Sequence, residues 1–470
     1  MTKIKFGTDG WRAVIAQDFT VDNVARVSIA TGKWLLGKER NPVVVVGHDC
    51  RFGGKLFAET VAKVLASMKI KVLLAEGFVS TPMISLGIVK HSAHLGVVIT
   101  ASHNPPGDNG YKLKGSYGGP LMESDTRDIE NMIPDEIDLF LDGMKIDELV
   151  KKGLIQIVDL ETTYIEHLKS HFDIKAISNS GFGFAFDAMF GAGQNVFKRI
   201  MPEIHMLHCT LNPLFNNIPP EPLHRNLGEF SQYIKDHKDI HCGLAVDGDA
   251  DRIAMYDEDG KYIDSHHIIL LLIHYLKKYK NIDGKVVTGF SSTVKVEKLA
   301  ETYGLKVLRV RIGFKDICKV MLTDDVLVGG EESGGISIKG HIPERDGIWM
   351  GLTLWQFMVE SGKTIKQIIK EIYDITGEFA FERSDLRIDP ELKKNIVQNC
   401  NSGTYKAFGK YQVQRVENLD GYKYFFSENR WLMIRPSGTE PVLRTYAEAE
   451  DTETAKDILA EGYKTIVTEK

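Results

Sequence analysis

The chain has 470 residues, too many for one hydrophobic core, and about 150 residues per domain predicts roughly three or four domains. Its net charge of −6 argues against a surface for nucleic acid or anionic membrane, so we expect neither partner. Five scattered cysteines without a CxxC pair predict neither a disulfide framework nor a zinc site, and the chain shows no signal peptide or spanning run, so we expect a cytoplasmic protein.

The first part of the chain predicts strands and helices in alternation. A glycine-punctuated opening, KFGTDGWRA, carries Asp9 and Arg12 and precedes a helix-like segment. The apolar run at 42–46 then predicts a buried strand, followed by a glycine-rich turn. The helix after this turn has apolar residues that share one face: Phe57, Val61, Val64, Leu65 and Met68.

Similar strand and turn openings recur at 182–187 and 285–289, which suggests three related α/β domains. The end of the chain differs, because the strand-like WLMIRP and VLRTYAEAE precede a final amphipathic helix. This pattern predicts a smaller C-terminal α+β domain. We expect four domains, at residues 1–150, 151–263, 264–377 and 378–470.

Residues 97–112, VVITASHNPPGDNGYK, are the stretch around which the predicted site is arranged. A strand-like apolar run ends at Thr100, and two prolines and an Asn-Gly pair then favour tight turns. Ser102 is therefore expected on a rigid loop at the end of a strand. Taken alone, this stretch could also be a plain solvated turn.

Residues 243–257, GLAVDGDADRIAMYD, place Asp247, Asp249 and Asp251 in a tight loop between strand-like runs. Three carboxylates this close repel one another unless a cation neutralises them, and Mg²⁺ is favoured because a phosphate could complete its shell. An EF-hand would need glycine where Arg252 stands, and helices at both flanks. A haloacid-dehalogenase type of aspartyl nucleophile and a plain acidic turn remain alternatives.

Two further loops offer ligand contacts. In GGEESGG, residues 329–335, Glu331 and Ser333 offer an acceptor and a hydroxyl of the kind that bind sugar hydroxyls. In RPSGTEP, Arg435 offers a planar fork of donors beside two hydroxyl residues, which is typical of a phosphate-binding turn. Either loop alone could be an ordinary surface turn.

Two common catalytic arrangements are not expected. The segment nearest to a Walker A motif, Gly362-Lys363-Thr364, has Phe357 where the first glycine should stand. Adjacent Ser102 and His103 should not make a base-to-nucleophile contact in ordinary geometry, which argues against a serine-hydrolase triad.

In combination, the four loops resemble those of the α-D-phosphohexomutase family, which includes phosphoglucomutases, phosphomannomutases and phosphoglucosamine mutases. TASHNP with the following NGYK, DGDADR, GEESGG and RPSGTEP occur in the family's order, and FGTDGWR resembles its N-terminus. The resemblance spans the whole chain. It implies three related α/β domains and a smaller C-terminal α+β domain around a central cleft, to which each domain gives one loop.

The resemblance also implies roles for single residues. Ser102 would carry a phosphoryl group, one oxygen of which would bind Mg²⁺ together with Asp247, Asp249 and Asp251. Lys112 would be the general acid/base, with a pKa lowered by desolvation and the metal, and His103 is a weaker candidate for that role. The remaining assignments are charge-stabilising Arg12 and Arg252, sugar-binding Glu331 and Ser333, and phosphate-binding Arg435, Ser437, Gly438 and Thr439.

The implied reaction interconverts hexose 1- and 6-phosphates through a phosphoserine enzyme and a hexose 1,6-bisphosphate, with glucose 1,6-bisphosphate as activator. Small sugar phosphates are the expected partners, and the protein is a monomer or homodimer. Many bacterial phosphomannomutase/phosphoglucomutase relatives read GEMSGH in the sugar loop, and phosphoglucosamine mutases tend to read GEQSGH. This chain has Glu332 and Gly335 there, which makes the amino-sugar assignment less favoured without excluding it. Glucose is the first choice and mannose the second. The alternatives are a phosphoglucosamine mutase, a phosphatase or phosphotransferase on the same scaffold, and a non-enzymatic Ca²⁺-binding protein.

Overall fold

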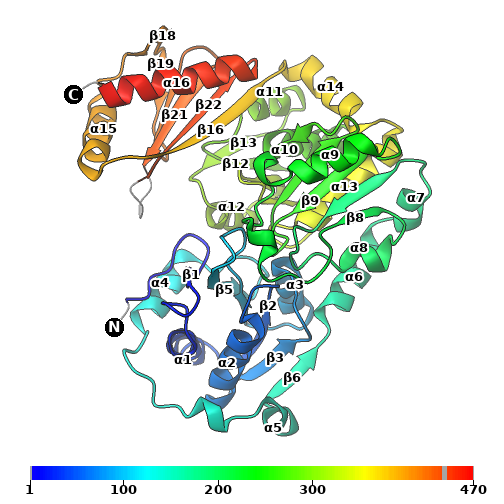
Figure 1. Ribbon diagram of the computed structural model, residues 1–470, viewed down its shortest axis with the longest axis vertical. Helices are drawn as coiled ribbons and strands as arrows, with labels where there is room; N and C mark the ends of the chain where they lie inside the picture. Colours follow the sequence, from blue (N-terminus) through cyan, green and yellow to red (C-terminus); the bar gives the residue numbers. More distant parts are fainter. Residues whose placement is uncertain (1–2, 437–441, 469–470) are drawn as a thin grey trace. The chain divides into compact units, whose positions relative to one another are not determined.

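The computed structural model describes residues 3–436 and 442–468, and these form two compact units (Figure 1). The first unit comprises the chain up to Lys285 together with Gly313–Ile368. The second comprises Val286–Ile312 and the chain from Ile369 onward. Within the described ranges, no helix combines the length and apolar character needed to cross a bilayer.

The first unit begins with a six-stranded sheet in the order β1-β5-β4-β2-β3-β6. Strands β4, β2, β3 and β6 run parallel, whereas β1 and β4 each pair with β5 antiparallel. The strands are β1 (Trp11–Val14), β2 (Val43–His48), β3 (Lys71–Ala75), β4 (Leu95–Ile99), β5 (Asp108–Gly115) and β6 (Ile155–Val158). The helices are α1 (Val21–Leu36), α2 (Gly54–Ser67), α3 (Thr81–Lys90), α4 (Glu123–Asn131), α5 (Ile146–Lys151) and α6 (Leu160–His171).

The parallel strands are apolar almost throughout because helices cover both faces of such sheets. Strand β2 confirms the strand predicted at 42–46, and α2 confirms the helix that follows it. Phe57, Val61, Val64 and Leu65 are buried on its predicted face, and Met68 is the residue that caps its C-terminal end.

A second, five-stranded sheet follows in the same unit, in the order β11-β10-β9-β7-β8. Strand β7 pairs parallel with β8 and β9, whereas β9, β10 and β11 pair antiparallel. The strands are β7 (Phe184–Asp187), β8 (His205–Leu207), β9 (Cys242–Val246), β10 (Ile253–Asp257) and β11 (Tyr262–Ile263). The helices are α7 (Ile174–Ser178), α8 (Val196–Ile200) and α9 (Gly228–Asp236). The tight turn between β9 and β10 therefore falls on the predicted acidic loop.

The rest of the first unit holds an antiparallel strand pair and buried helices. Strands β14 (Val326–Gly330) and β15 (Ile336–Ile338) flank the predicted sugar-binding loop. The helices are α10 (Ser265–His274), α12 (Phe314–Met321) and α13 (Gly347–Ser361). Asp346 caps α13, because its carboxylate accepts the N–H of Trp349 at 3.0 Å.

The second unit contains an antiparallel five-stranded sheet in the order β16-β22-β21-β20-β19, with α16 packed on it (Figure 1). From Glu382 onward, side chains of β16 alternate between half-buried and exposed, as is typical of one-sided sheets. The strands are β12 (Lys285–Gly289), β13 (Val307–Val310), β16 (Ala380–Arg387), β17 (Ala407–Phe408), β18 (Tyr411–Gln412), β19 (Arg415–Glu417), β20 (Tyr422–Phe425), β21 (Trp431–Pro436) and β22 (Val442–Ala449). The helices are α11 (Lys295–Thr302), α14 (Ile365–Thr376), which begins in the first unit, α15 (Pro390–Ser402) and α16 (Thr452–Thr468).

Candidate active site

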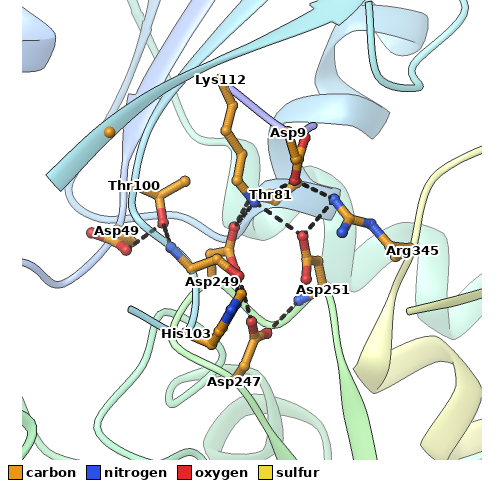
Figure 2. Close-up of polar contacts among 12 residues, drawn as sticks. Asp9, Asp49, Thr81, Thr100, His103, Lys112, Asp247, Asp249, Asp251 and Arg345 are labelled. Atoms are coloured by element: carbon orange, nitrogen blue, oxygen red, sulfur yellow. Dashed lines mark hydrogen bonds and ion pairs between the residues drawn. The ribbon is translucent and has the colours of Figure 1, made fainter. Parts of the chain in front are cut away.

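Ser102 lies on the loop after strand β4, as the sequence predicts. Its N–H donates to the Thr100 hydroxyl at 2.9 Å, and its φ of 53° is left-handed, which is uncommon for a residue other than glycine. Arg51 donates to the carbonyls of Ser102 at 2.6 Å and of Asn104 at 2.7 Å. The Thr100 hydroxyl in turn donates to Asp49 at 2.5 Å (Figure 2). These contacts hold the loop in place, and Ser102 is only 1% exposed.

Asp247, Asp249 and Asp251, the acidic triad, lie in the turn between β9 and β10 and are fully buried (Figure 2). The Ser102 hydroxyl donates to Asp247 Oδ2 at 2.8 Å, although 145 positions separate these residues in the sequence. The other oxygen of Asp247 accepts the N–H groups of Asp251 and Arg252. The structure therefore brings the serine loop and the acidic loop together.

A divalent cation fits the oxygen atoms of the acidic triad. One carboxylate oxygen from each aspartate lies within 4.8 Å of the other two. Asp249 Oδ1 and Asp251 Oδ1 are buried and have no hydrogen-bond partner among the described residues, a costly state that a cation would relieve. Such hard oxygen donors suit Mg²⁺. The EF-hand alternative is wrong, because strands and not helices flank the loop.

Lys112 reaches from strand β5 into the acidic triad (Figure 2). Its Nζ lies 2.7 Å from Asp249 Oδ2, 3.1 Å from Asp251 Oδ2 and 3.0 Å from Asp9 Oδ2. Burial lowers the pKa of Lys112, but these three carboxylates outweigh burial and hold the pKa above that of an ordinary lysine. Two of these carboxylates belong to the acidic triad, and the predicted lowering of the lysine pKa depends on a metal held there, so it stays a prediction.

His103 lies beside the serine, with its Nδ1 3.2 Å from the Ser102 hydroxyl. The expectation that adjacent residues would not make this contact is wrong, because Ser102 adopts a left-handed backbone outside ordinary geometry. Burial, followed by the charges of Arg252 and Arg12, lowers the pKa of His103 well below its usual value. The imidazole is therefore neutral near neutral pH.

Arg12 and Arg252 bring positive charge to the serine loop. Arg12 donates to Asn104 Oδ1 at 2.6 Å, and Arg252 Nη1 lies 3.3 Å from Glu221 Oε1. Burial lowers the pKa of Arg12, Asp9 opposes this effect, and Arg252 adds to it. The positive charge of Arg252 therefore acts on Arg12.

Glu331 and Ser333 lie in the turn that joins β14 to β15, and Glu331 is buried whereas Ser333 is half-buried. The turn lies against the acidic loop, because Gly335 and Arg252 form an isolated β-bridge. Burial, and then the neighbouring Glu332, raise the pKa of Glu331 to about 7. This carboxyl group therefore holds a proton at pH values where ordinary glutamates have lost theirs.

This raised pKa predicts a pH-dependent stability. Because folded Glu331 binds its proton more tightly than the unfolded residue, the free energy of unfolding falls as the pH rises from 4.5 towards about 7. Glu331→Gln removes this loss, so the variant should gain ~3 kcal/mol relative to the unmodified chain between about pH 5 and about pH 8. Urea unfolding at both pH values measures this gain. The raised pKa of Glu331 would be contradicted if the difference in unfolding free energy between Glu331→Gln and the unmodified chain did not change with pH. An equal gain in the surface variant Glu301→Gln would contradict it too.

The predicted phosphate-binding loop is described only in part. Arg435 lies on β21 opposite Arg444 on β22. Its Nε and Nη2 each lie 3.2 Å from a carboxylate oxygen of Asp420. Ser437, Gly438 and Thr439 lie outside the described residues.

Sequence reasoning assigned no role to several residues that contact the site. Arg345 Nη2 lies 2.6 Å from Asp9 and 2.8 Å from Asp251, and Lys114 pairs with Glu344. Thr81 donates to Asp249 Oδ2 at 2.5 Å (Figure 2). Two signals could have found some of them: the alternation of Lys112 and Lys114 on one strand, and the charged run at 344–346 between apolar segments.

Comparison with known proteins finds models for phosphoglucomutase/phosphomannomutase domains along the chain. Alpha/beta/alpha domains I, II and III match residues 3–138, 162–260 and 264–375, and the C-terminal domain matches 392–464. These matches confirm the predicted fold class of three α/β domains and a smaller C-terminal domain.

Curated relatives and solved structures cover the same length. The phosphoglucomutase/phosphomannomutase of Thermococcus kodakarensis is 28% identical, covering 98% of this chain and 97% of the relative. The phosphoglucosamine/phosphogalactosamine mutase of Sulfurisphaera tokodaii is also 28% identical, covering 98% of each chain. The crystal structure of a candidate phosphomannomutase from Thermus thermophilus matches with a TM-score of 0.87 at 32% identity, covering 99% of each chain.

Proposed function

Because the chain belongs to the phosphoglucomutase/phosphomannomutase family and is a phosphohexomutase, we propose that it interconverts glucose 1-phosphate and glucose 6-phosphate with Mg²⁺ and a phosphoserine at Ser102. Mannose phosphates are the second choice of substrate. The observation that carries the proposal is the 2.8 Å hydrogen bond from the Ser102 hydroxyl to Asp247. Asp247 belongs to the acidic loop, in which Asp249 also pairs with Lys112.

The phosphoryl group moves in two transfers. The phosphoserine gives its phosphate to the free hydroxyl of the sugar monophosphate, so one P–O bond to serine breaks as one to the sugar forms. The resulting bisphosphate turns over, and its other phosphate returns to Ser102. Glucose 1,6-bisphosphate is the proposed activator, because it can phosphorylate a chain whose serine is free.

The acidic triad, through a bound magnesium ion, and the two arginines stabilise the negative charge of the transferring phosphoryl group. A magnesium ion held by the triad and by a phosphate oxygen on Ser102 would withdraw negative charge from the transferring group. Arg12, on β1 and hydrogen-bonded to the serine loop, and Arg252, directly after the acidic triad, stabilise the same charge. Because a serine oxygen is a poor nucleophile and a poor leaving group, these charges are needed in both transfers.

Proton transfer is assigned to Lys112. Its ammonium form, favoured by the raised pKa, suits the donation of a proton to the oxygen that loses the phosphoryl group. The neutral amine that results would take up the proton of the attacking hydroxyl, so each transfer balances. The neutral imidazole of His103, 3.2 Å from the serine hydroxyl, is the second candidate. Glu331 and Ser333 are the proposed contacts of the sugar hydroxyls.

Arg435, with Ser437, Gly438 and Thr439, is proposed to bind the phosphate that does not react. Since either end of the sugar carries that phosphate in turn, Arg435→Ala should raise KM for both the 1-phosphate and the 6-phosphate by about tenfold or more, as expected for a lost charge-assisted hydrogen bond. Initial rates in both directions measure this. Arg415→Ala, which removes an exposed arginine of β19, is the control. An effect on only one isomer would argue against a shared phosphate site.

A phosphoglucosamine mutase is the alternative to a glucose or mannose enzyme, because curated relatives of almost full coverage carry amino-sugar names. A coupled assay with the 1-phosphates of glucose, mannose, glucosamine and N-acetylglucosamine decides between them through kcat/KM. The highest value for glucose supports the first choice, and the highest value for an amino sugar replaces it. Release of inorganic phosphate without isomerisation would instead indicate a phosphatase.

A further inference from the structure

Arg345 is a buried cation to which the proposed reaction gives no role. It is 5% exposed, and its Nη2 lies 2.8 Å from Asp251 Oδ2 and 2.6 Å from Asp9 Oδ2 (Figure 2). Its Nε donates to Glu344 Oε1 at 3.2 Å, and its guanidinium lies 5.4 Å from the centre of the Phe314 ring. One side chain thus joins the opening loop of the chain to the acidic loop.

The contacts of Asp251 are divided between its two oxygens. Oδ2 forms ion pairs with the guanidinium of Arg345 and the ammonium of Lys112, whereas Oδ1 is buried without a hydrogen-bond partner in the described ranges. Asp249 is arranged in the same way, with Thr81 and Lys112 on Oδ2 and no described partner on Oδ1. Hydrogen bonds and ion pairs on one oxygen fix the rotation of a carboxylate and so aim its other oxygen.

Gly335 leaves the space that the stem of Arg345 occupies. Gly335 does not have a positive φ, so its conformation alone does not require glycine. A Cβ atom at this position would lie 2.4 Å from Arg345 Cδ and 3.0 Å from Arg345 Cγ. Because the guanidinium is held by several carboxylates, the stem cannot move away without loosening them.

We propose that Arg345 is a positioning residue for the metal ligands and that Gly335 is needed to make room for it. The proposal rests on the proposed function only in that the acidic triad binds Mg²⁺. Arg345 turns Asp251 so that Oδ1 is presented to the ion, as Thr81 does for Asp249. As a mere positive charge, Arg345 would repel a divalent cation, so its removal would tighten binding. Positioning and charge therefore predict opposite outcomes.

Calorimetric titration of the full chain with Mg²⁺ alone tests this. Arg345→Met removes the guanidinium, and Arg345→Lys keeps the charge but loses the planar group whose Nη2 lies on Asp9 and Asp251 while its Nε donates to Glu344. We expect both variants to bind Mg²⁺ about tenfold or more weakly, as outer-shell substitutions do, and Gly335→Ala to change affinity in the same direction. In assays, kcat should recover as Mg²⁺ is raised, with KM for the sugar phosphate unchanged.

Two matched variants are the controls. Arg26→Met removes another buried arginine, which donates to the Pro134 carbonyl, and Gly32→Ala places a Cβ 2.5 Å from Met68 Sδ. Both should bind Mg²⁺ like the unmodified chain. If Arg345→Met does not fold by circular dichroism, Arg345→Lys and Gly335→Ala decide.

The possible failures are distinguishable. Unchanged or tighter Mg²⁺ binding by folded Arg345→Lys overturns the positioning role while leaving the proposed function intact. An unmodified chain that does not bind Mg²⁺ overturns both.

Discussion

Replacing Ser102 by alanine is expected to lower hexose phosphate turnover by about 10⁴-fold or more while leaving sugar phosphate binding measurable. The reason is that the Ser102 hydroxyl is the one that donates to Asp247. The neighbouring hydroxyls of Thr81 and Thr100 donate to other carboxylates and are not placed to replace it. A coupled assay measures turnover, and mass spectrometry shows whether phosphate remains on the chain. Turnover within tenfold of the unmodified chain would falsify the assignment.

Two companion variants separate chemistry from folding. Ser102→Gly should be as inactive as the alanine variant but no less stable, because glycine adopts the observed φ of 53° without strain. Ser116→Ala, at an exposed position beyond β5, should retain activity and phosphorylation. Loss of activity in the Ser116 variant would mean that alanine substitution in this region acts through the fold.

Replacing Lys112 by methionine is expected to lower turnover by about 10²-fold to 10⁴-fold, the range typical of general acid–base groups. Its Nζ is the ammonium nearest to Asp249, at 2.7 Å, and methionine keeps much of the side-chain volume without a proton to transfer. Single-turnover transfer from phosphoserine to the sugar measures the chemical step directly. A change in product release alone would leave this rate untouched.

Lys114→Met is the matched control for this variant. Lys114 is equally buried on β5, but its ammonium pairs with Glu344 and lies 3.8 Å from Asp9. Lys114→Met should lower the free energy of unfolding, and it should lower turnover less than Lys112→Met does. If both lysine variants lost the same single-turnover rate, Lys112 would contribute only its positive charge and would not transfer the proton. His103 would then be favoured as the general acid/base.

Local sequence patterns were sufficient for most of the fold and for the separate parts of the site. The apolar run at 42–46 and the helical spacing after it predicted β2 and α2, because periodicity records which face is buried. The turn chemistry after Thr100 placed Ser102 at the end of a strand. The acidic loop between apolar runs became a hairpin, which excludes an EF-hand.

Patterns could not supply the electrostatics of the site. The pKa of Lys112 is raised because the carboxylates of Asp249, Asp251 and Asp9 converge on one ammonium group, whereas the predicted lowering also assumed a bound metal. The contact between Ser102 and His103 was not expected, because it depends on a left-handed backbone that no residue type requires there. The first outcome follows from segments that are distant in the sequence, and the second from a backbone conformation that the residue types do not specify.

The sequence by itself determined the residue types, their order, the strand ends on which they lie, and through its motifs the family. Only the tertiary structure decided that Ser102 meets Asp247 across 145 positions and that Arg345 meets Asp9 across 336. The physical reason is that backbone preferences act over a few residues, whereas charge pairing and desolvation act through space between segments that only the packed core brings together.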